Sequence, residues 1–136
     1  MEDCIFCKII EGKIPSAKVY EDDKVIAFLD ISPHNKGHCL IVPKTHSKNL
    51  LEVKREDLNS LIQVAQKVAQ AAMKAFDFPA FNLVVNNGKE SGQVVFHSHI
   101  HIIPRFDNDG IIFTAKHLKY QGDELSEYAE KIKKFI

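Results

Sequence analysis

The sequence predicts a single α+β domain built on a mainly antiparallel sheet. Two observations support this fold class. Apolar runs of strand length outnumber helical patterns, and short turns rich in Gly, Pro, Asn and Asp join most of these runs. One long stretch, from about Glu56 to Phe76, has apolar residues at three-and-four spacing, so one long helix is expected to pack on the sheet.

Composition narrows the functional classes. The chain has 136 residues, 45% of them hydrophobic, which suffices for one domain with a genuine core. Lys+Arg and Asp+Glu are both 18, so the balanced charge argues against bulk binding to nucleic acid or to an anionic membrane. The acidic start, Met1-Glu2-Asp3, is unlike a secretory signal, and three cysteines do not form a disulfide framework. We therefore expect a cytoplasmic protein.

The chain opens with a C-x-x-C pair, Cys4 and Cys7. Such a pair is either a redox dithiol or half of a zinc site, and by spacing alone both remain open. The residues around it fit a short helical turn that ends at Gly12. Val19–Glu21 and Val25–Leu29 then read as a hairpin around a polar turn.

A buried strand and the long helix follow the hairpin. Gly37–Pro43 is nearly continuously apolar, which predicts a central strand, and its Cys39 is expected to be core. The apolar stripe of the helix is expected to pack against the sheet; it comprises Leu58, Leu61, Ile62, Ala65, Val68, Ala69, Ala72, Met73 and Phe76. Phe81–Asn86 alternates as a further strand, and a polar loop follows it.

The most informative stretch is the strand expected from about Val94 to Pro104. Because strand side chains alternate between faces, His97, His99 and His101 would share one face, with neighbouring rings about 6–7 Å apart. That spacing suits a central nucleophile with helpers, or a metal site. Beyond an exposed tail, Asp123–Ile136 is expected to form a C-terminal helix. Its expected packed side comprises Leu125, Tyr128, Ile132 and Phe135.

The histidine pattern and several flanking motifs resemble the HIT (histidine triad) superfamily of nucleotidyl hydrolases and transferases, in its HINT-like branch. The matching segments are Phe28–Pro33, Gly37-His38 through His46, Asn86-x-Gly88, Gly92-Gln93 and His97-x-His99-x-His101. The resemblance covers roughly residues 4–105 and implies a single HIT domain over 1–136, with 106–136 as a tail or helix. It also implies a homodimer.

The resemblance implies chemistry at the α-phosphate of a purine nucleotide. His99 matches the nucleophile that forms a nucleotidyl-histidine intermediate, His101 the residue that helps the phosphate or the leaving group, and His38 a further histidine of the site. Asp30 matches the carboxylate that holds the ribose. The matched base walls are Ile5, Phe6, Ile9, Phe28 and Ile31, and the positions around the phosphates are Asn86, Gly92 and Gln93.

Two positions depart from the family pattern. Ser98 replaces a usual apolar residue, and Val94 stands where relatives often carry a hydroxyl that contacts the leaving group. The expected activity is a nucleoside phosphoramidase that releases AMP or GMP. The alternatives are a dinucleoside polyphosphate hydrolase, a nucleotide-binding or adaptor protein with residual activity, and a site in which all three histidines hold one metal ion.

In a subset of the family, a C-x-x-C pair joins two histidines to bind zinc. The matching residues are Cys4, Cys7, His46 and His97, which would form a closed structural Cys₂His₂ site. On this reading His97 is a metal ligand, and no catalytic cofactor is needed because a histidine is the nucleophile. The alternative is that both cysteines are simply small buried residues.

Overall fold

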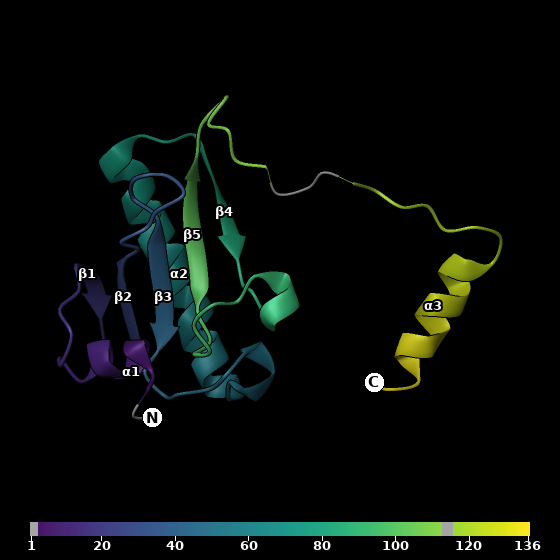
Figure 1. Ribbon diagram of the computed structural model, residues 1–136, viewed down its shortest axis with the longest axis horizontal. Helices are drawn as coiled ribbons and strands as arrows, with labels where there is room; N and C mark the ends of the chain where they lie inside the picture. Colours follow the sequence, from purple (N-terminus) through teal and green to yellow (C-terminus); the bar gives the residue numbers. More distant parts are fainter. Residues whose placement is uncertain (1–2, 113–115) are drawn as a thin grey trace.

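The computed structural model describes residues 3–112 and 116–136, and its centre is a five-stranded antiparallel sheet (Figure 1). The strand order is β1-β2-β3-β5-β4. The strands are β1 Lys18–Glu21, β2 Val25–Leu29, β3 Cys39–Pro43, β4 Ala80–Val84 and β5 Ile100–Arg105. The predicted α+β class and central buried strand are confirmed, since β3 lies between β2 and β5 and is buried along its whole length.

One face of the sheet packs against the long helix α2, Arg55–Phe76. The strand residues of this core alternate with those of the opposite face, as a pleated sheet requires. The buried residues of this core are Val25, Ala27, Cys39, Ile41, Leu61, Val64, Ala65, Val68, Ala69, Ile100 and Ile102. Two predicted members of the helix stripe are wrong: Ile62 and Phe76 are about half exposed, because the buried stripe instead runs through Val64.

The opposite face of the sheet carries a second core around Phe6 of α1, Ile5–Ile10. Its strand residues are Ile26, Phe28, Leu40 and Val42. Leu40 pairs with His101 across the β3–β5 ladder, so His101 lies on this same face. The sheet therefore separates a purely structural core under α2 from a face that combines aromatic residues with histidine.

The predicted histidine strand is too long at its start. The strand β5 begins at Ile100, so only His101 of the three triad histidines lies in it. Before Ile100 the ladder with β3 is replaced by two other bonds: the side chain of His97 donates to the carbonyl of Pro43, and the backbone amide of Ser98 donates to the carbonyl of Ser47. Pro43 has no N–H to continue pairing, which explains why the ladder stops here.

The turn after β5 is fixed by Asp109. Its carboxylate accepts bonds from Arg105 Nε at 2.8 Å and from the amides of Phe106 and Ile111. Asn35 also reaches it at 3.2 Å. The predicted exposed tail therefore leaves the domain only after a tightly bonded turn.

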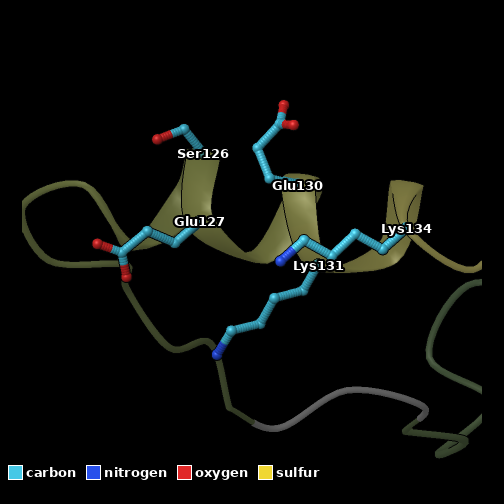
Figure 2. Close-up of a pocket in the computed structure, with 5 residues that line it drawn as sticks. All are labelled: Ser126, Glu127, Glu130, Lys131 and Lys134. Carbon is cyan, nitrogen blue, oxygen red and sulfur yellow. The ribbon is translucent and has the colours of Figure 1, made fainter.

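The C-terminal helix α3, Glu124–Lys133, is present, but the predicted packing is wrong. It stands apart from the sheet (Figure 1), and none of its residues is buried. The four side chains expected on its packed side are exposed: Leu125, Tyr128, Ile132 and Phe135. Figure 2 shows a shallow polar hollow along α3, far in the chain from any histidine of the triad. Among the described residues, no helix is both long and apolar enough to cross a membrane.

Candidate functional site

The two N-terminal cysteines meet two histidines at one end of the sheet. Cys4 Sγ lies 3.3 Å from His97 Nδ1, and Cys7 Sγ lies 3.4 Å from His46 Nδ1 and 3.6 Å from His97 Nδ1. The two Nδ1 atoms are 3.2 Å apart. A tetrahedral zinc ion sets its ligands about 3.3 Å apart for two nitrogens and about 3.5 Å apart for nitrogen and sulfur. The four residues therefore fit a zinc ion in both ligand type and spacing.

A second contact orients the buried His97 for such a site. Its Nε2–H donates to the carbonyl of Pro43 at 2.7 Å, so the Nδ1 lone pair faces the cysteines. Burial lowers the pKa of His97 to about 4, which keeps the ring neutral as a ligand must be. The amide of Cys7 donates to Cys4 Sγ at 3.3 Å. This geometry fits a metal ligand, and the role of His97 as a ligand rather than a proton carrier stays a prediction.

His99 is held by the residue two positions before it. Its Nδ1 lies 2.6 Å from the carbonyl oxygen of His97, and because a carbonyl only accepts, Nδ1 must carry the proton. The Nε2 atom is then left with its lone pair. Burial lowers the pKa of His99, so the ring is neutral at pH 7 and its Nε2 is a competent nucleophile.

His38 and His101 form a hydrogen-bonded pair with ordered protons beside His99. The amide of His34 donates to His38 Nδ1 at 3.1 Å, so the proton of His38 is on Nε2. That Nε2–H donates to His101 Nδ1 at 2.9 Å, which places the proton of His101 on its own Nε2. Burial lowers the pKa of His101 to about 4 and also lowers that of His38. In the resting site, His101 is thus a neutral hydrogen-bond donor rather than a cation.

The rings of His99 and His101 lie side by side, with centroids 4.8 Å apart. Asp30 approaches from the other side, with Oδ2 3.7 Å from His38 Nε2. Its Oδ1 accepts the amide of Ser32 at 2.8 Å, so one oxygen fixes a turn and the other remains available to a ligand. Asp30, His38 and His101 also lie close enough together to hold a metal ion, but the two histidines already bind each other.

The predicted base walls separate into two groups. Phe6 and Phe28 are buried with ring centroids 5.5 Å apart, and Ile9 is half-buried beside them. Ile5 is 45% exposed and Ile31 is 97% exposed, so neither forms part of an enclosed wall. Phe6 also contacts His99, with its ring edge-on at 5.0 Å between centroids, a contact that the sequence pattern did not indicate.

The loop expected around the phosphates is organised by Gln93. Its side-chain oxygen accepts the amide of Gly88, and its Nε2 donates to the carbonyls of Lys48 and Val95. Gln93 is buried and its amide is occupied, so it fixes the loop rather than offering a free donor to phosphate. Gly92, at φ +98°, lies beside the amide of Asn86, and a Cβ there would come within 3.9 Å of it. Asn86 and Gly92 are thus brought together as predicted.

Three features escaped the sequence reasoning or correct it. A site with one ion held by all three triad histidines is not what the structure forms, because His97 turns to the cysteines and His99 to a carbonyl. His34, unnoticed before, stacks on His38 with centroids 5.4 Å apart and orients it through its amide. Its position four residues before His38 was the only signal. The hydroxyls of Ser47 and Ser98, each directly after a candidate metal ligand, are buried without a partner.

Comparison with known proteins gives a consistent result. The family model described as the HIT domain matches residues 11–108. A crystal structure of a HIT family member from Bacillus subtilis has a TM-score of 0.90 and 43% identity, covering 98% of this chain and 97% of that one. The protein named "Adenylylsulfatase HINT3" from Arabidopsis thaliana is 40% identical over 96% of this chain and 66% of its own length. A Zn-bound histidine triad family protein from Mycobacterium smegmatis has a TM-score of 0.77 and 35% identity, covering 85% and 84% of the two chains.

Proposed function

This chain belongs to the HIT family, and on that premise we propose that it is a nucleotide hydrolase acting at the α-phosphate of purine nucleotides. The observation that carries the proposal is the bond between His99 Nδ1 and the His97 carbonyl. It leaves Nε2 neutral and with its lone pair, which a nucleophile needs and a mere binding site does not. The relative named an adenylylsulfatase supports an adenylyl-containing substrate.

The reaction proceeds in two steps. His99 Nε2 attacks the α-phosphorus, the bond to the leaving group breaks, and a nucleotidyl-histidine forms. His101, which is neutral in the resting site, donates a hydrogen bond from its Nε2–H to a phosphate oxygen or to the leaving atom, and an amine leaving group takes up its proton from solvent. Water then attacks the same phosphorus, His99 leaves, and the nucleoside monophosphate is released. His38 maintains the direction of the His101 proton by its bond to Nδ1.

The remaining side chains bind and orient the nucleotide. Asp30 Oδ2 accepts hydrogen bonds from the ribose hydroxyls, while Phe6, Phe28 and Ile9 contact the base. Asn86 and the backbone at Gly92 approach the phosphates, because a glycine with positive φ lets its N–H come close to an anion. We choose a nucleoside phosphoramidate as substrate, releasing AMP or GMP, over a dinucleoside polyphosphate.

We further propose that Cys4, Cys7, His46 and His97 hold one structural zinc ion. The tetrahedral spacing of their four ligand atoms supports this, as does the Zn-bound relative. The ion would tie α1 to the end of β3 and to the start of the triad segment. His99 needs no metal ion for its attack, because its nitrogen is itself the nucleophile.

We also propose a cytoplasmic homodimer. The strand β4 is an edge of the sheet with an exposed Leu83, and α2 exposes Ile62. An unpaired edge strand is a ready surface for a second copy. Light scattering coupled to size-exclusion chromatography would report about twice the mass of one chain. A single-chain mass at micromolar concentration would contradict the dimer.

The function is tested by measuring AMP release from adenosine 5′-phosphoramidate. Diadenosine polyphosphate and adenylyl sulfate are assayed as alternative substrates that carry other leaving groups. No magnesium is added. We expect the phosphoramidate to have the highest kcat/KM, and His99→Ala to abolish release while AMP still binds. AMP binding without turnover of any of the three substrates would favour the binding or adaptor role instead.

A further inference from the structure

The cysteine pair of the metal cluster is open to solvent on one side. Cys4 is partly exposed and, with His46 and Lys48, lines a cleft of about 510 Å³, whereas Cys7 is buried behind it. Both sulfurs contact the same His97 Nδ1, and they lie within 4.8 Å of each other. A small oxidant in the cleft would therefore meet Cys4 first, with Cys7 in place as the second sulfur.

The same cluster is joined to the nucleophile through two residues. His97 offers its Nδ1 to the metal site, while its own carbonyl fixes the His99 ring at 2.6 Å. Phe6 lies between the two cysteines in α1, and its ring packs 5.0 Å from His99 and 6.0 Å from His97. Any change at the sulfurs therefore acts on groups that hold His99 in place.

We propose that Cys4 and Cys7 form a site of reversible oxidation that switches the nucleophile off. In the reduced protein the two thiolates, His46 and His97 hold zinc, and His99 keeps its bond to the His97 carbonyl. In the oxidised protein a Cys4–Cys7 disulfide removes two of the four ligands, and His99 loses its fixed orientation. The inference rests on the proposed function for its effect on catalysis, and on the proposed zinc site.

The oxidant is a peroxide, and the chemistry balances with hydrogen peroxide alone. The Cys4 thiolate attacks one peroxide oxygen, the O–O bond breaks, and Cys4 becomes a sulfenic acid. The Cys7 thiolate then attacks the Cys4 sulfur, and the S–S bond forms as the oxygen leaves. Two sulfurs give up one electron each, the buffer supplies two protons, and two water molecules are produced. A dithiol reductant reverses the change.

The expected consequence follows from the ligand count. Two imidazoles alone bind zinc far more weakly than two imidazoles with two thiolates, because the negative charge that compensates the ion is gone. Once the ion is lost, His97 keeps its bond from Nε2 to Pro43 and its ring contacts with Phe6 and His46, but its Nδ1 no longer has a metal partner. The His99 Nδ1–H is then free to leave the His97 carbonyl, and the wrong tautomer of His99 cannot attack.

The test uses the zinc-loaded full chain treated with hydrogen peroxide at matched time points. Intact mass reports the loss of two hydrogens, a chromogenic chelator reports released zinc, and imidazole ¹⁵N NMR reports the His99 Nδ1–H. AMP release from a phosphoramidate is followed in parallel. We expect disulfide, zinc release and loss of the His99 signal to rise together, with AMP release falling at least tenfold and recovering after dithiothreitol and zinc.

The control is Cys39→Ser, which removes the third cysteine. Cys39 is buried in the sheet core and donates to the Gly37 carbonyl, a bond that serine keeps. This variant should respond to peroxide as the wild type does. A second control is reduced protein stripped of zinc by a chelator, which should lose the His99 signal as the oxidised protein does.

Three results would overturn the proposal: a disulfide that forms while zinc stays bound, a zinc-free reduced protein that keeps its His99 signal, or a Cys39→Ser variant that no longer responds. Its failure is distinguishable from that of the proposed function. If reduced, zinc-loaded protein never releases AMP, the proposed function fails, whereas zinc release and the NMR signal still decide the switch.

Discussion

The bond between His38 and His101 offers a sharp test of how the site directs its protons. His38 is 1% exposed, and its Nε2 lies 2.9 Å from His101 Nδ1. His38→Leu fills much of the same volume but removes the donor, so His101 no longer has a fixed tautomer. His38→Gln is the matched control, because its side-chain amide can place an N–H near the position of the lost Nε2.

The magnitude follows from one buried hydrogen bond. Leaving the His101 Nδ1 acceptor without its donor costs about 1–2 kcal/mol. If that penalty falls on the reacting tautomer, the rate should decrease about five- to thirty-fold, at about 1.4 kcal/mol per factor of ten. We expect His38→Leu to lower kcat for phosphoramidate hydrolysis about five- to thirty-fold, with little change in KM. His38→Gln should keep most of the wild-type kcat.

The assay is steady-state AMP release, with circular dichroism to show that both variants are folded. A His38→Leu variant with at least half of the wild-type kcat would refute the reasoning. So would a folded His38→Gln variant that loses as much activity as His38→Leu, because volume rather than the N–H would then be the cause.

Three further predictions address the metal, the pH response and the turn. Elemental analysis of protein purified without added zinc should find about one zinc per chain; less than about half an equivalent in a reduced sample would contradict the site. The free energy of unfolding should fall between pH 6.5 and 4, and His101 should contribute up to about 3 kcal/mol of that fall, because unfolded His101 takes up a proton near pH 6.5 and folded His101 only near pH 4; the lowered pKa of His97 adds to the same fall. A His101→Gln variant with the same slope in that window would count against this cause. Asp109→Ala should lower Tm and expose the segment after Arg105 to limited proteolysis, since the bonds of this carboxylate to four partners are lost; an unchanged cleavage rate would show that the turn is held otherwise.

The sheet was largely predictable because its signals are local. The hairpin around Asp22 and the buried strand ending at Pro43 are visible as apolar runs separated by turn residues, and both were found as predicted. The start of β5 could not be predicted in this way. The alternation of histidines extends back to His97, whereas the pairing with β3 ends at Ile100. Only the tertiary contacts of His97 and Ser98 show where the ladder ends.

The grouping of the metal ligands came from the family resemblance, not from spacing. Cys4 and His97 are 93 positions apart, and no local pattern could bring them within 3.3 Å. The tautomer of each histidine also could not be predicted from the sequence. It is fixed by the amide of His34 and by the carbonyls of His97 and Pro43, which only the structure shows. The prediction that one side of α3 packs on the domain was wrong. An amphipathic pattern indicates that a helix has an apolar side, but it does not say which surface covers that side.

The central claim is that His99 becomes covalently attached to the nucleotide. The most direct measurement is intact-protein mass spectrometry after brief mixing with adenosine 5′-phosphoramidate and quenching in denaturant, with His99→Ala alongside and a slowly hydrolysed analogue as a second substrate. The account predicts an adenylyl adduct on the wild-type chain and none on His99→Ala. An adduct that persists on His99→Ala, or AMP release by that folded variant at the wild-type rate, would contradict it.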